Sequence, residues 1–165
     1  MSGNDVRGAT GLRNLVPATA QSQSFGGKGS GMPKALTVVL CEDMLYKSSG
    51  SDSVWTVDVY DVPEIRALGP MIEQIRAHYV CEGATAAFQA RVTTYWSVLG
   101  KSWSSASEIL PAQTADKTGV ISSWFTTDTA FGLLMRYGVE VKNNTGVPTI
   151  ESGHVTVVLE IELKS

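Results

Sequence analysis

The sequence predicts an all-β protein: an antiparallel β-sandwich, of which a jelly roll is one form, with an extended N-terminal arm and at most one short helix. Three observations lead to this prediction. Several short segments alternate apolar and polar residues, turn-forming residues separate these segments, and the first 34 residues keep no period of 2 or 3.6 for long. We therefore expect an arm at residues 1–34 and a sandwich domain at residues 35–165.

The clearest strand signal is in the last segment, HVTVVLEIELK, residues 154–164. Its odd-numbered residues are all apolar and most of its even-numbered residues are polar, which is typical of a half-buried antiparallel strand. The run LLMRYGVEVK, residues 133–142, repeats the pattern and places Arg136, Glu140 and Lys142 on the solvent side. Because turn formers separate the two runs, we expect them to pair as a hairpin.

Earlier segments predict further strands. ALTVVLC, residues 35–41, is apolar on both faces and suits an interior strand, while VWTVDVYD, residues 54–61, predicts a buried face with Trp55, Val57 and Val59. A shorter strand is expected within residues 120–127. In TAAFQARVTTYWSVLG, residues 85–100, the alternation predicts one buried face comprising Phe88, Ala90, Val92, Thr94, Trp96 and Val98.

Residues 64–80 match two patterns. Ile65, Leu68 and Ile72 have helical spacing, but Gly69-Pro70 would end a helix after little more than one turn. From Met71 onward the residues also alternate as in a strand. We favour a short turn of helix followed by a strand, and the sequence alone leaves the choice between helix and strand open.

Composition and charge exclude several classes of protein. Hydrophobic residues make up 43% of the chain, charged residues 18%, and the net charge is -3, which excludes a disordered chain and a strongly basic nucleic-acid binder. The sequence shows no signal peptide and no apolar segment long enough to span a bilayer. We therefore expect a protein made in the cytoplasm, without a membrane partner or specific binding to nucleic acid.

No pattern predicts catalysis, a cofactor or a metal site. His78 and His154 lack a nearby triad arrangement, and Glu160 and Glu162 lie on an alternating outer face where charge is expected. Cys41 and Cys81 are far apart, so we interpret them as buried free thiols on strands, with a disulfide as the alternative. Asn143-Asn144-Thr145 is formally a glycosylation acceptor, which we interpret as an ordinary turn.

The tryptophans suggest one binding function. Trp103 lies in a predicted turn and Trp124 in the short strand expected within residues 120–127. Flat rings in rim loops or on a sheet face can stack on sugars, as in a carbohydrate-binding module. Trp55 and Trp96 fall on apolar faces, so we assign them to the core.

The arm suggests a different function. Ordering each residue costs about 1 to 2 kcal/mol, so the whole arm costs several tens of kcal/mol. Its six larger apolar side chains would return only roughly 9 to 18 kcal/mol on burial. Four of them, Leu12, Leu15, Val16 and Phe25, are the predicted anchors. An ordered arm therefore needs extensive hydrogen bonding, along a sheet edge or between subunits. The arm carries +3, because four basic residues oppose Asp5, which leaves -6 for the body.

These observations predict a non-catalytic structural subunit of a homomeric assembly, joined through its arm. Its partners would be copies of itself and other proteins of a virion, phage particle, shell or filament. The alternative is a carbohydrate-binding module that uses Trp103 and Trp124. No cofactor is expected in either case.

Overall fold

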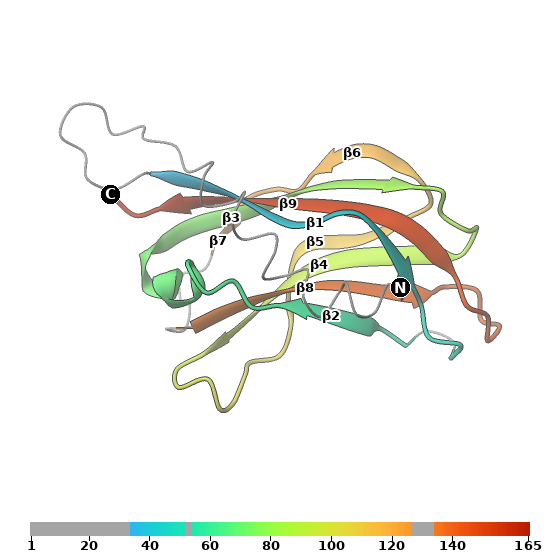
Figure 1. Cartoon of the computed structure of the whole chain (residues 1–165), viewed down its shortest axis with the longest axis horizontal. Coiled ribbons are helices and arrows are strands. Elements are labelled where there is room, and N and C mark those ends of the chain that lie inside the picture. Colours follow the sequence, from blue (N-terminus) through green and yellow to red (C-terminus); the bar gives the residue numbers. More distant parts are fainter. Residues whose placement is uncertain (1–33, 52–53, 127–133) are drawn as a thin grey trace.

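The computed structural model describes residues 34–51, 54–126 and 134–165, which form two antiparallel β-sheets packed face to face (Figure 1). Sheet A has the strand order β1 (Ala35–Lys47), β9 (Ser152–Leu163), β3 (Ile72–Glu82) and β6 (Lys117–Ile121), and β7 (Phe125–Thr126) also pairs with β3. Sheet B has the order β2 (Thr56–Tyr60), β8 (Leu134–Asn143), β4 (Phe88–Ser97) and β5 (Ser107–Thr114). The predicted antiparallel β-sandwich is confirmed.

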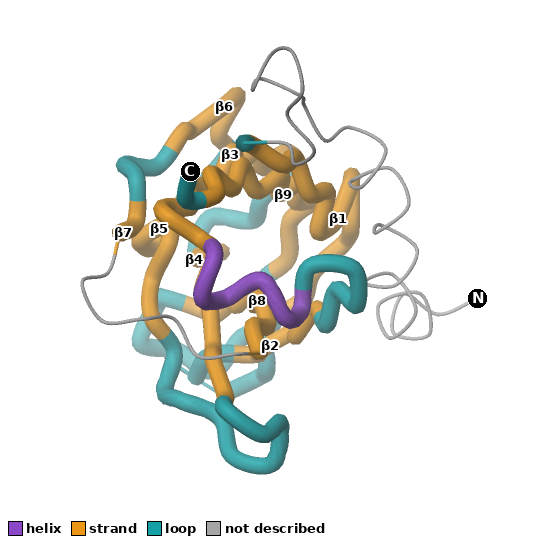
Figure 2. The backbone as a smooth tube through the Cα atoms, turned by 90° about the vertical axis from the view of Figure 1, so that its left-hand side faces the viewer, coloured by secondary structure: helices purple, strands orange, loops and turns teal. Residues whose placement is uncertain are grey.

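The core lies between the two sheets, where the inner faces of the strands meet (Figure 2). The odd-numbered residues of β9 from Val155 to Leu163 are buried, as the alternation predicts. Cys41 and Cys81 are both free and buried in this core, which confirms their interpretation as buried thiols. Burial raises the pKa of the Cys41 thiol to about 12.

The predicted hairpin of β8 and β9 is wrong. β8 pairs with β2 and β4 in sheet B, whereas β9 pairs with β1 and β3 in sheet A. The connection between them therefore crosses from one sheet to the other. Alternation shows which side of a strand is buried, but both strands bury one side in the same core, so it does not show which strands pair.

β1 differs from its prediction in position and length. It lies at the end of the sheet order and continues to Lys47, whereas the sequence suggested an interior strand ending at Cys41. Its outer face is half-buried at Ala35, Thr37 and Val39, which accounts for the apolar residues on both faces. Two register shifts after Val39 allow the strand to continue along β9.

β2 has the opposite orientation from the predicted one. Tyr60 is buried, whereas Val57 and Val59 are 44% and 45% exposed. The tyrosine ring offers more apolar area to the core than a valine side chain, and its hydroxyl bonds that of Tyr46. Packing of the larger side chain therefore decided which face of β2 turned inward.

Residues 64–80 form a short helix followed by a strand, as favoured from the sequence. A 3-10 helix, η1, spans Arg66–Met71 and includes Gly69-Pro70, and β3 begins directly after it. The strand expected within residues 120–127 is divided into β6 and β7. Ser122 causes the division, because its backbone N–H and its hydroxyl both bond the backbone of Ala77, each at 2.9 Å.

No helix among the described residues is long and apolar enough to cross a membrane.

Candidate functional site

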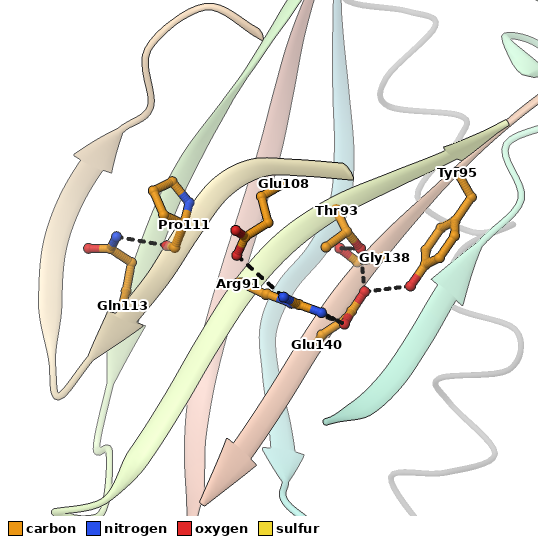
Figure 3. A network of polar contacts seen from close by, with 8 residues as sticks. All are labelled: Arg91, Thr93, Tyr95, Glu108, Pro111, Gln113, Gly138 and Glu140. Carbon is orange, nitrogen blue, oxygen red and sulfur yellow. Dashed lines mark hydrogen bonds and ion pairs between the residues drawn. The ribbon is translucent and has the colours of Figure 1, made fainter. Parts of the chain in front are cut away.

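A network of polar side chains covers the outer face of sheet B, centred on Glu140 of β8 (Figure 3). Arg91 of β4 lies directly opposite and donates two hydrogen bonds to Oε1, at 3.1 Å from Nε and 2.8 Å from Nη2. Thr93 donates its hydroxyl to Oε2 at 2.6 Å, and Tyr95 donates to the same oxygen. Glu140 is only 1% exposed, so the prediction that it faces solvent is wrong.

Two residues make this burial of Glu140 possible. Gly138 provides the space, since a Cβ there would lie 2.5 Å from Thr93 Oγ1 and 3.1 Å from Tyr95 Cε2. Trp55 provides part of the cover, because its ring stacks on Arg91 at 4.2 Å. Trp55 is therefore half-buried on the outer face, and its predicted place in the core is wrong.

The carboxylate of Glu140 is charged, and its hydrogen-bonding capacity is used within the network. Burial opposes the charge on Glu140, but hydrogen bonds from Thr93, Tyr95 and Arg91 outweigh that effect and hold the pKa of its carboxyl below the ordinary value. Each carboxylate oxygen already accepts two hydrogen bonds. The arrangement therefore holds strands together, and its carboxylate has no lone pair directed at a ligand.

The outer face of sheet A carries a second network. Arg76 Nε and His78 Nε2 contact the same oxygen of Glu160, at 2.8 Å and 2.9 Å. The hydrogen bond from Arg76 is the main cause that lowers the pKa of Glu160. His154 lies 3.3 Å from a carboxylate oxygen of Asp43. Both histidines thus contact carboxylates across neighbouring strands.

The structure does not bring the two tryptophans predicted for glycan binding together. Trp103, between β4 and β5, lies against the guanidinium of Arg136 on sheet B, at 4.0 Å. Trp124, between β6 and β7, lies against Arg76 on sheet A, at 4.3 Å. Each ring therefore has a cation on one face, and the two belong to opposite sheets.

A shallow groove of about 370 Å³ lies where β4 ends, lined by residues 96–99 and 101–104. Trp96 and Val98 are 40% and 59% exposed there, so their predicted burial is wrong, although the buried face of β4 holds as predicted from Phe88 to Thr94. The chain turns away from the sheet after Ser97. Alternation cannot detect where the sheet ends, and at this end Trp96 lines the same groove as Trp103.

Asn143 is part of a hydrogen-bonded turn. It is fully buried, and its Nδ2 donates to the backbone oxygens of Val147 at 2.6 Å and Thr149 at 2.9 Å. Because glycosylation needs that nitrogen, the folded chain does not present it as an acceptor. This agrees with the interpretation of Asn143-Asn144-Thr145 as an ordinary turn.

The predicted arm anchors Leu12, Leu15, Val16 and Phe25 lie outside the described residues. Within the described ranges, no group of three or more His, Cys, Asp or Glu side chains is placed to hold a metal ion.

Comparison with known proteins identifies a fold. No protein-family model and no curated protein matches the chain. Among solved structures, it is similar to VP2 in the infectious bursal disease virus VP2 subviral particle, with a TM-score of 0.56 and 11% identity over 80% of this chain and 33% of that one. The structure of the Gx strain of the same virus matches with a TM-score of 0.56 and 12% identity, over 80% of this chain and 32% of that one.

A third match is the N-terminal cellulose-binding domain of a Cellulomonas fimi β-1,4-glucanase, with 14% identity over 86% of both chains. Its TM-score of 0.36 is too low to count as a shared fold. The chain therefore shares its β-sandwich fold with part of VP2, and it spans about a third of the length of those virus chains.

Proposed function

We propose that this chain is a non-catalytic structural subunit of a homomeric assembly, a component of a virion, phage particle, shell or filament. The observation that carries the proposal is the strand order, β1-β9-β3-β6 facing β2-β8-β4-β5. We interpret this order as that of a jelly roll, the double-sheet arrangement that viral capsid domains use. The similarity of fold to VP2 of a subviral particle supports the same interpretation.

Similarity of fold alone does not establish function, so the proposal also depends on the chain's own chemistry. Residues 1–34 carry +3 and the remaining body -6, and opposite charges favour contact between the arm of one copy and the body of the next. Leu12, Leu15, Val16 and Phe25 would be the apolar anchors of that contact. The partners would be copies of this chain and other particle proteins, and the protein would be located in the virion.

The test is the mass of the full-length protein in solution, measured by light scattering over a range of concentrations. We expect a large species, either discrete or growing with concentration. A chain lacking residues 1–30 should remain a folded monomer of about the mass of its sequence. A truncated chain that assembles like the full-length protein would show that the arm is not the joining element.

A carbohydrate-binding module is the second candidate, favoured by the exposed aromatic groove that contains Trp103. Because Trp103 and Trp124 lie on opposite sheets, they would form two separate single-ring sites rather than one platform. Glycan-array binding that disappears in Trp103→Ala would support this candidate, and the absence of glycan binding by the wild type would contradict it.

A further inference from the structure

The connection between β4 and β5 extends away from both sheets (Figures 1 and 2). We call residues 96–104 the tip loop. It presents three large apolar side chains to solvent, with Trp96 40%, Val98 59% and Leu99 76% exposed. Apolar side chains that gather at one exposed place indicate a contact surface, because their exposure to water is unfavourable.

The tip loop has a defined shape. Trp96 N–H donates to Ser104 Oγ at 3.0 Å, and Ser104 N–H donates to the Trp96 carbonyl at 2.9 Å. Inside this closure, Gly100 N–H donates to Ser97 Oγ at 2.8 Å, and Gly100 has a φ of 77°, which favours glycine. A partner would therefore meet a preformed surface, and little conformational freedom would be lost on binding.

The tip loop is also positively charged relative to the body. Lys101 lies in the loop, and Trp103 stacks on Arg136, which shares Asp61 with Arg66 at 3.8 Å and 2.5 Å. The loop itself carries +1, from Lys101, and no carboxylate occurs between residues 96 and 107. Together with the adjacent Arg136, Arg66 and Asp61, which lie outside the loop, the net charge of this end is +2. Since residues 35–165 as a whole carry -6, the rest of the body carries -8, so a negatively charged counterpart must lie elsewhere on it.

A groove of about 480 Å³ on sheet A offers such a surface. Its walls include Glu73, Glu160 and Glu162, together with the apolar groups of Ala35 and Leu163. We call it the acidic groove. Lys34 and Ser165 complete its lining, so its charged side chains sum to -2, and Glu73 is the carboxylate in it that is not already engaged by Arg76, His78 or Gln74. In Figure 1 the beginning of β1 and the end of β9 lie at the same end of the sandwich as the tip loop, but on the other sheet.

We propose that the tip loop of one copy docks into the acidic groove of the next. Val98 and Leu99 would pack against the half-buried Ala35 and the small part of Leu163 that is exposed, 7% of it, and Lys101 would face the exposed Glu73. The two surfaces are different and lie on opposite sheets, so the contact is heterologous and repeats from copy to copy, as rings, shells and filaments require. This inference rests on the proposed function, because it names a second contact within the same assembly.

The first test uses the full-length chain and follows mass against concentration by light scattering. Leu99→Asp should raise the concentration for half-assembly about tenfold or more, because the contact would have to bury a charge where the wild type buries a leucine. The control is Ile150→Asp, at a side chain 64% exposed in the connection between β8 and β9, which should assemble like the wild type. Circular dichroism establishes that both variants are folded.

The second test exchanges charges. Lys101→Glu and Glu73→Lys should each raise the half-assembly concentration about three- to tenfold, and the double variant should restore it. Single variants that weaken assembly without rescue in the double variant would overturn the assignment of the acidic groove. Normal assembly of Leu99→Asp would overturn the tip-loop contact while the proposed function stands, whereas a wild-type chain that stays monomeric would overturn both.

Discussion

At the scale of the residue, Gly138 decides how the outer face of sheet B packs. With no side chain at this position, the ring of Tyr95 and the hydroxyl of Thr93 can approach β8 and bond Glu140. A residue with a Cβ would displace one or both, and the buried carboxylate would lose donors. An unpaired buried charge is among the costliest defects in a folded protein.

We therefore expect Gly138→Ala to lower the free energy of unfolding by about 1–3 kcal/mol, because overpacking would force neighbouring groups apart. Urea denaturation measures the change. Gly50→Ala is the matched control, since a Cβ there meets nothing closer than Ile150 Cγ1 at 3.9 Å. The control should change stability by less than about 0.5 kcal/mol. Equal denaturation midpoints for the two variants would contradict this account of Gly138.

At the scale of the element, the connection from β8 to β9 depends on the last residue of β8. The side chain of Asn143 donates to the backbone of Val147 and Thr149, and its Oδ1 accepts hydrogen bonds from Thr145 N–H at 2.8 Å and from Thr145 Oγ1 at 2.7 Å. These bonds hold the chain in the path by which it leaves sheet B and enters sheet A.

Asn143→Ala should lower the free energy of unfolding by about 1–3 kcal/mol, because the backbone oxygens of Val147 and Thr149 and the N–H of Thr145 would lose their partner in the buried Asn143 side chain. Chemical denaturation monitored by tryptophan fluorescence measures the change. Asn144→Ala, at an exposed neighbouring position, should leave stability within about 0.5 kcal/mol of the wild type. If Asn144→Ala lowers the free energy of unfolding as much as Asn143→Ala does, the side chain of Asn143 is not what stabilises the turn.

At the scale of the whole molecule, acid should destabilise both sheets through one carboxylate on each. The pKa values of Glu140 on sheet B and Glu160 on sheet A are held below the ordinary value of 4.5. A carboxyl group whose pKa is lower in the folded state stabilises the fold above its unfolded pKa, and this contribution is lost as the pH falls through the folded pKa.

We expect the free energy of unfolding to decrease as the pH falls below about 4.5, the unfolded value for both groups. Glu140→Gln should be less stable than the wild type near neutral pH and should lose less stability on acidification. Part of the pH dependence of the free energy of unfolding should remain in this variant, because Glu160 is still present. Urea denaturation from pH 7 to pH 3 measures both effects. Identical slopes for the two proteins would exclude Glu140 as a source of the acid sensitivity.

The fold class and the buried faces of several strands could be predicted from the sequence. Alternation in β9 and in the first part of β4 correctly predicted their core residues, because which side of a strand is apolar is a local property of the chain. The isolated positions of Cys41 and Cys81 likewise predicted free thiols. The assembly arm and its anchors stay predictions, since they lie outside the described residues.

The pairing of strands, the orientation of β2 and the burial of Glu140 could not be predicted from the sequence. These depend on contacts between residues far apart in the sequence: β8 lies beside β4 and β2, the Tyr60 hydroxyl meets Tyr46, and Arg91 faces Glu140 from a neighbouring strand. The alternation of apolar and polar residues within one strand does not predict such contacts. The buried carboxylate and the exposed tip loop therefore became visible only when both sheets were in place.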